Sequence, residues 1–235
     1  MKVLAFETST EACAVALHVD GRTLERFELA PRRHAELALP WADALLAEAG
    51  VSRAQLDAVA VGRGPGAFTG VRLGIGLAQG IALALDLPVV PVSTLQVLAL
   101  RAPAHADKVL ACIDARMGEV YAAAYARDGE QWRALGREAV LPPASVVLPD
   151  DEAGWYAVGT GMAAADGVLG QRLGRQLAGV DATALPHASD VLKLALPAIA
   201  RGQVVAAERL EPAYLRDNVA LTLAEQQAAR AARGG

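Results

Sequence analysis

The sequence predicts an α/β protein made of two similar halves, each with a mixed sheet and helices on its faces. Three pairs of segments recur in the same order, about 100 residues apart, which indicates an internal duplication. In the first half, strand patterns joined by short turns precede alternating helix and strand patterns. That order is typical of a mixed sheet whose faces are covered by helices.

The repeated segments have the same three parts in both halves: two strands joined by a polar turn, a glycine turn, and a terminal helix. The pairs are residues 3–17 and 109–125, 60–64 and 157–161, and 92–100 and 188–196. A polar segment with a proline lies between the halves, at 101–107. We therefore expect an N-terminal domain over 1–101, a C-terminal domain over 102–220, and a tail over 221–235.

Hydrophobic periodicity gives the elements of the first half. It predicts strands over 3–8, 12–19, 22–29, 57–62 and 88–92, and helices over 34–49, 69–85 and 93–101. Pro40 lies inside the first helix, so we expect it to kink that helix or to mark its true first turn.

Composition restricts the class of protein. The chain is 54% hydrophobic with a net charge of −4, so bulk electrostatics do not favour nucleic-acid binding, although Arg32 and Arg33 could contact RNA locally. Cys13 and Cys112 lie in apolar runs and are expected to be reduced and buried. Charges near the N-terminus exclude a signal peptide, and the run 73–85 is shorter than a bilayer span. We expect a soluble, cytoplasmic protein with no membrane segment.

The glycine turn before the helix 69–85 first resembles a phosphate cradle. Gly62, Gly64 and Ala67 fit the dinucleotide pattern, but Asp86 precedes the next strand instead of ending it. Pro65 removes one N–H, and the Gly-Lys-Ser/Thr of a Walker A loop is missing. We therefore interpret the turn as one that lets backbones pack closely.

Catalytic and metal-ligating patterns are missing from the sequence. The four histidines are scattered, and none has a second histidine at metal-ligand spacing. His34 opens a predicted helix and is expected to be a surface or capping residue. Neither cysteine has a base nearby in sequence, and no nucleophile elbow is present. We expect no catalytic residue, no cofactor and no metal.

The helix 69–85 is apolar on two sides, and its one polar line is Arg72, Gln79 and Asp86. Such a helix is covered on both sides, either within the monomer or by a partner. Glycines four residues apart would let another backbone approach closely. The sequence leaves open which stripe faces outward. The expected partner-contacting residues, which include part of the helix 34–49, are Leu37, Trp41, Leu45, Val71, Gly74, Ile75, Ala78 and Ala82.

Several motifs together resemble the TsaB family. They are Glu7-Thr-Ser9, Arg33-His34, the block 60–72, Val92-Ser-Thr-Leu95, Asp114-Ala-Arg-Met-Gly-Glu119 and Pro212-Ala-Tyr-Leu-Arg216. The resemblance implies two ribonuclease-H-like domains of the actin-like ATPase and sugar-kinase superfamily. It also implies a non-catalytic dimerisation subunit for making threonylcarbamoyladenosine at position 37 of tRNAs that read codons beginning with A.

The resemblance further implies the partners. The chain would bind the transferase TsaD, help to recruit TsaE, reach tRNA through that complex, and form a homodimer when alone. TsaD carries a pair of metal-binding histidines where this sequence has Thr94 and Leu98, so catalysis is expected in the partner. Ala67 replaces the serine that is common in the family's own motif.

The main alternative is a stand-alone, degenerate nucleotide hydrolase or kinase of the same superfamily. It would need an acidic residue to hold Mg²⁺ near the hairpin turn, and Glu7 and Asp114 are the candidates. A metalloprotease of the superfamily is weaker still, because the paired histidines are missing.

Overall fold

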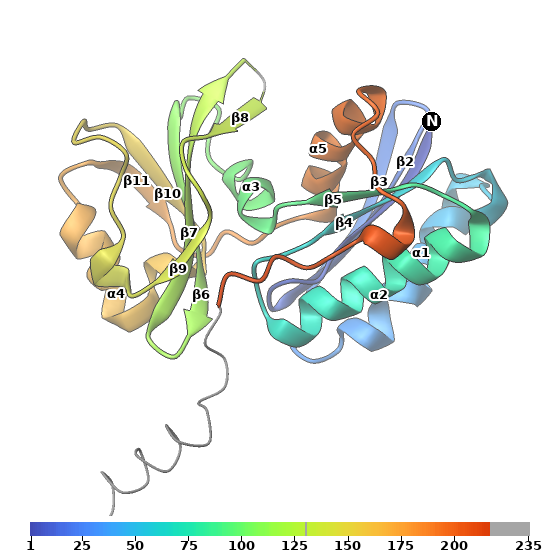
Figure 1. Cartoon of the computed structure of the whole chain (residues 1–235), viewed down its shortest axis with the longest axis horizontal. Coiled ribbons are helices and arrows are strands. Elements are labelled where there is room, and N and C mark those ends of the chain that lie inside the picture. Colours follow the sequence, from blue (N-terminus) through green and yellow to red (C-terminus); the bar gives the residue numbers. More distant parts are fainter. Residues whose placement is uncertain (130, 217–235) are drawn as a thin grey trace, which may run out of the picture.

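A computed structural model describes residues 1–129 and 131–216 of the chain. It shows two mixed sheets beside each other with helices packed on their faces (Figure 1), which confirms the predicted fold class. The predicted tail at 221–235 lies outside the described residues.

The first sheet contains five strands in the order β3-β2-β1-β4-β5. Strand β1 is antiparallel to β2 and parallel to β4, as the hairpin followed by helical crossovers requires. Its strands are β1 (Lys2–Glu7), β2 (Ala12–Val19), β3 (Arg22–Leu29), β4 (Ala58–Gly62) and β5 (Val89–Val92). The helices of this half are α1 (His34–Ala49), α2 (Phe68–Leu85) and the short α3 (Thr94–Ala99). All eight elements agree closely with the predicted ranges.

The second sheet has the order β11-β10-β6-β7-β8, and β9 also pairs with β7. Its strands are β6 (Lys108–Arg116), β7 (Glu119–Asp128), β8 (Gln131–Ala134), β9 (Ala139–Leu141), β10 (Trp155–Val158) and β11 (Leu177–Asp181), and its helix is α4 (Ala164–Leu173). Read in reverse, this order repeats the first sheet strand for strand, with β6 in the place of β1. The central strand is again antiparallel to one neighbour and parallel to the other, so the predicted duplication is confirmed.

The terminal helix of each repeat packs on the sheet of the other half. Helix α5 (Ala188–Ala200) buries Ala188, Val191 and Leu192 against the first sheet, on the face opposite to α1 and α2. Helix α3 instead buries Leu95 and Leu98 in the core of the second sheet. Both helices lie between the two sheets (Figure 1). The predicted division at residue 101 therefore does not separate the two cores.

After α5 the chain returns across the first half and packs on α2. Val205 pairs with Val89 of the edge strand β5. The Gln79 side chain donates to the carbonyls of Ala207 and Leu210, at 3.0 and 3.2 Å. We call residues 203–216 the C-terminal strap. Part of the polar line of α2 thus anchors the chain's own C-terminal segment.

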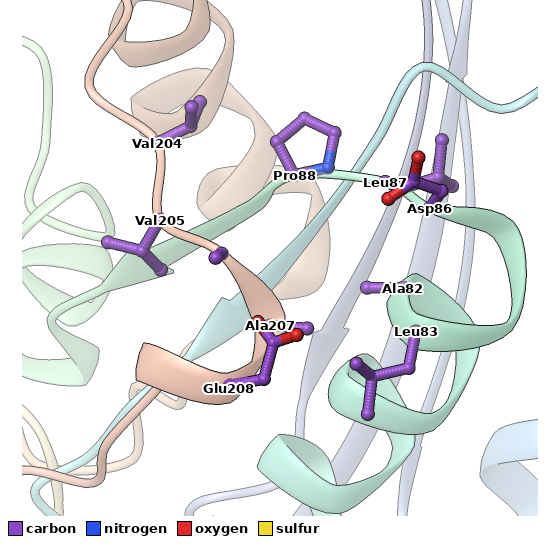
Figure 2. Close-up of a pocket in the computed structure, with 10 residues that line it drawn as sticks. Ala82, Leu83, Asp86, Leu87, Pro88, Val204, Val205, Ala207 and Glu208 are labelled. Atoms are coloured by element: carbon purple, nitrogen blue, oxygen red, sulfur yellow. The ribbon is translucent and has the colours of Figure 1, made fainter.

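A surface hollow of about 410 Å³ lies where the strap meets the end of α2. Figure 2 shows Ala82 and Leu83 of α2 on one side of it, and Ala207 and Glu208 of the strap on the other. Asp86 lies at its edge, where the helix ends in a left-handed conformation.

Helix α1 runs through Pro40 without ending there. Pro40 is the seventh residue of the helix, so the prediction that it marks the first turn is wrong. His34 does not cap the helix: its Nε2 lies 2.9 and 3.1 Å from the carbonyl oxygens of Thr10 and Ala12, at the start of β2. This side chain fixes the beginning of α1 against the first sheet.

The glycines at the start of α2 allow the helix to contact the turn after β1. A Cβ at Gly70 would lie 2.0 Å from the carbonyl oxygen of Thr8, and one at Gly66 would lie 2.2 Å from that of Ser9. Ala67 N–H donates to the Ser9 carbonyl at 2.7 Å. The interpretation of this turn as a close-packing device is confirmed.

Gly70→Ala is expected to lower the free energy of unfolding by about 1–3 kcal/mol, because its Cβ overlaps the Thr8 carbonyl oxygen in the turn after β1. The control is Gly80→Ala on the same helix, where a Cβ meets nothing within 4 Å. That change is expected to raise stability by up to about 1 kcal/mol through helix propensity. Urea denaturation of both variants measures the difference, and equal effects would contradict the packing argument.

Candidate functional site: an interdomain cavity and an uncharged helix face

A cavity of about 910 Å³ opens between the two halves. It is bordered by the turn after β1, the start of α1, the start of α2, the β6–β7 hairpin and the end of the strap. Its charged lining residues are Glu11, Arg32, Arg72, Asp114, Arg116 and Arg216, and its aromatic lining residues are His34, Phe68, Tyr121 and Tyr214. The sequence reasoning did not bring these residues together, because they come from five separate segments.

Arg72 organises the side of the cavity at the start of α2. Its guanidinium carbon lies 3.3 Å from the centre of the Phe68 ring and 5.0 Å from the centre of the Tyr214 ring. The same guanidinium donates to the Tyr214 hydroxyl at 2.8 Å and to the Phe68 carbonyl at 3.1 Å. Cation–π contacts and hydrogen bonds together hold the two rings and the guanidinium in one fixed group. We call these three residues the Arg72 platform.

The opposite side is the tip of the β6–β7 hairpin. Arg116 and Met117 both adopt positive φ, and Met117 is 86% exposed. Arg216 of the strap donates to the Glu119 carboxylate at 2.5 Å and to the Ala115 carbonyl at 3.3 Å. The strap therefore connects α2 of the first half to the hairpin of the second.

Glu7 lies in a buried polar cluster beneath the glycine turn and does not line the cavity. Its carboxylate accepts from the Ser9 N–H at 2.8 Å and from the Thr94 hydroxyl at 3.1 Å. The Gly64 N–H donates in turn to the Thr94 oxygen at 3.2 Å. Burial raises the pKa of Glu7 above its usual value, although these hydrogen bonds oppose the rise. Glu7 thus closes a buried hydrogen-bond network, and its burial favours the protonated acid more than water does.

Glu7→Gln is expected to make stability less sensitive to pH. Because folding raises the pKa of Glu7, the folded state binds its proton more tightly than the unfolded chain does. The resulting stabilisation is complete below the usual pKa of a glutamic acid and is lost as pH rises through the folded-state pKa. The amide carries no charge, so the variant should not lose stability in this way.

Melting temperatures of both proteins between about pH 5 and pH 8 check this. We expect the melting temperature of the variant to rise relative to that of the wild type as pH rises. A constant difference would contradict a raised pKa for Glu7 in the folded state.

The second acidic candidate for Mg²⁺ is also held by protein groups. Asp114 accepts from the Arg116 N–H at 2.8 Å and from its guanidinium at 3.0 Å. Of these two candidates, Asp114 lines the cavity, whereas Glu7 is buried beneath the glycine turn. Over residues 1–129 and 131–216, no group of three or more His, Cys, Asp or Glu side chains is arranged to hold a metal ion.

Both cysteines are buried and free, as predicted. Burial raises the pKa of Cys13 to about 11, helped by the nearby Glu28 charge, and raises that of Cys112 to about 12. Thiols with such pKa values are poor nucleophiles at neutral pH.

The structure corrects the choice of partner-contacting residues. Six of the eight lie in the core between the first sheet and its helices: Leu45, Val71, Gly74, Ile75, Ala78 and Ala82. A Cβ at Gly74 would lie 2.6 Å from the Thr8 hydroxyl oxygen. Leu37 and Trp41 are half-buried against the same core. A partner of the folded chain would therefore meet the other apolar stripe of α2, and the interface itself stays a prediction.

That other stripe is uncharged along its whole length. Its members are exposed or half-buried: Thr69, Leu73, Gly76, Leu77, Gly80, Leu83 and Ala84. We call this set the open face of α2. Leu83 is 56% exposed, and a Cβ at Gly76 or Gly80 meets nothing within 4 Å. By length and composition α2 could cross a bilayer, a test that core helices also pass, yet only 33% of it is buried within the chain.

Comparisons with known proteins agree with this architecture. Residues 27–223 match the family model described as TsaD: tRNA N6-adenosine threonylcarbamoyltransferase. The tRNA threonylcarbamoyladenosine biosynthesis protein TsaB of Escherichia coli K12 is 47% identical over 225 residues, covering 94% of this chain and 96% of that protein. The Haemophilus influenzae protein of the same name is 43% identical over 231 residues, covering 93% and 95%.

A solved structure shows the same fold. YeaZ from Pseudomonas aeruginosa superposes with a TM-score of 0.85 at 49% identity, over 91% of this chain and 99% of that one. Together with the TsaD-type model, this match identifies the two halves as domains of the ribonuclease-H-like, actin-like ATPase fold. Identity near one half over nearly the full length of both chains places this chain in the TsaB family.

Proposed function

We propose that this chain is a non-catalytic subunit in the biosynthesis of threonylcarbamoyladenosine in tRNA. It binds a TsaD-type transferase, which modifies N6 of adenosine 37, and it helps to recruit TsaE. The names of the relatives support the pathway. The observation that carries the binding role is the open face of α2, seven uncharged residues that the chain's own fold leaves exposed or half-buried.

The family match supports a TsaD-type partner. This chain contains the domain type of the transferase, so a TsaD-type partner has its own pair of helices corresponding to α1 and α2. Two such pairs can pack about a pseudo-twofold axis into a four-helix bundle, in which exposed glycines allow close approach of the helix backbones. When the partner is absent, two copies of this chain would bury the same surface in a homodimer.

The residues at the two positions where the resemblance expects metal-binding histidines favour a binding role over catalysis. Thr94, which stands where the resemblance places a metal-binding histidine, uses its hydroxyl within the Glu7 cluster. Leu98, at the other histidine position, is buried in the core of the second domain. Since tRNA modification takes place in the cytoplasm, we place the chain there.

Calorimetric titration with ATP and Mg²⁺ separates this function from a stand-alone nucleotide hydrolase or kinase. We expect the isolated chain to show no turnover and no micromolar binding of the nucleotide. Micromolar binding accompanied by hydrolysis would overturn the non-catalytic proposal. A second titration, of the TsaD-type partner into this chain without nucleotide, should give a binding isotherm.

A further inference from the structure

We propose that the interdomain cavity binds unpaired nucleotides of the tRNA that the pathway modifies. This inference rests on the proposed function for the identity of the RNA. It goes beyond that function because it assigns direct RNA contact to this chain. A tRNA presents such nucleotides in its loops, where bases can leave the stack and be held by aromatic and arginine side chains.

The first observation is the concentration of positive charge. The chain as a whole has a net charge of −4, yet the cavity is lined by Arg32, Arg72, Arg116 and Arg216 and by only two carboxylates, those of Glu11 and Asp114. An overall acidic protein with an arginine-lined cavity is suited to attract a local anion without binding polyanions over its whole surface.

The second observation is that only some of these arginines form ion pairs. Arg116 and Arg216 form ion pairs with Asp114 and Glu119, which position the hairpin and the strap. Among the residues that the structure describes, Arg32 and Arg72 pair with no carboxylate. These two charges are therefore the ones available to phosphate groups.

The third observation is the Arg72 platform. Phe68 is 66% exposed and Tyr214 is 62% exposed, although each packs one side against the guanidinium. Exposed aromatic rings in a fixed orientation offer flat surfaces on which bases stack, and the adjacent guanidinium can contact the phosphate between them. Rings, cation and cavity together match the chemistry of an unpaired nucleotide better than that of an apolar peptide.

The position of the platform connects RNA binding with partner docking. Phe68 and Arg72 lie in the first turns of α2, the same helix whose open face is proposed to contact the transferase. An RNA loop seated in the cavity would therefore lie beside the docked partner. The chain would then hold the substrate as well as the enzyme.

Fluorescence anisotropy with a labelled anticodon stem–loop RNA tests the proposal on the full-length chain, alone and in complex with its partner. We expect the stem–loop to bind at least about tenfold more tightly than a fully paired duplex of the same length, because only the loop offers unstacked bases. Tyr214→Ala and Phe68→Ala should each weaken stem–loop binding by about tenfold, as expected for one stacked base. Arg72→Ala should also reduce the slope of log affinity against log salt by about 0.7, the value for one contact with a single-strand phosphate.

Two controls keep this result distinct from the proposed function. Arg22→Ala removes an exposed arginine at the start of β3 and should leave RNA affinity unchanged. Gly80→Glu on the open face should abolish partner binding while the isolated chain keeps its RNA affinity. Circular dichroism confirms folding of each variant. Equal binding of stem–loop and duplex, or wild-type affinity in both Tyr214→Ala and Phe68→Ala, would overturn the RNA proposal even if the partner still docks.

Discussion

Gly80→Glu in α2 is expected to leave the protein folded and to weaken its binding to a TsaD-type partner by at least about 100-fold, a loss of hot-spot size. Position 80 lies at the middle of the open face, and a Cβ there meets nothing within 4 Å. The folded monomer therefore accepts the side chain. A partner helix packed against that glycine would have to move away or bury the new carboxylate unpaired.

Size-exclusion chromatography followed by calorimetric titration measures this loss. The control is Ala178→Glu, which adds the same charge at an exposed position of β11, in the second sheet. It should co-elute with the partner as wild type does. If Gly80→Glu binds with wild-type affinity, the open face of α2 is not the docking surface.

Ala78→Glu, on the opposite face of the same helix, is expected to prevent stable folding. Ala78 is fully buried in the core beneath the first sheet. A glutamate there would bury a charge without a partner or displace α2 from the sheet. Breaking a core in this way costs several kcal/mol, which is a large part of the stability of a typical domain.

Ala84→Glu is the matched control, because it makes the same substitution at an exposed position six residues later in α2. It should melt within a few degrees of wild type by circular dichroism, whereas Ala78→Glu should lack a cooperative transition. Similar melting of the two variants would mean that the assignment of core and open faces is wrong.

The helices and strands of the first half were predictable because each carries a local signal. Nearly continuous apolar runs mark β1 and β2, and the left-handed Gly50 ends α1. The duplication was predictable as well, since the repeated motifs survive at corresponding places in both sheets.

Which of the two apolar stripes of α2 faces the core was not predictable from the sequence. The stripe through Val71, Ile75 and Ala78 and the stripe through Leu73 and Leu77 are both apolar at helical spacing. Hydrophobicity alone therefore does not distinguish core from surface. The distinction depends on where glycine is required: Gly70 and Gly74 face the backbone and side chain of Thr8, whereas Gly76 and Gly80 face open space.

The cavity depends on contacts between segments far apart in sequence, and so does the packing of α3 and α5 on the sheet of the other half. Arg72 and Tyr214 are 142 residues apart, and Gln79 reaches Leu210 across a similar distance. Local patterns mark these residues as polar or aromatic but carry no information about which strap or sheet they meet. The four arginines that line the cavity come from the loop before α1, from α2, from the β6–β7 hairpin and from the strap, and they form a group only when these segments pack together.

Nucleoside mass spectrometry of bulk tRNA tests the central claim most directly. Cells depleted of this protein should lose threonylcarbamoyladenosine, expression of the wild-type chain should restore it, and expression of Gly80→Glu at equal abundance should not. Unchanged threonylcarbamoyladenosine after depletion would contradict the proposed pathway. Full restoration by Gly80→Glu would contradict the claim that the chain acts by docking a partner on α2.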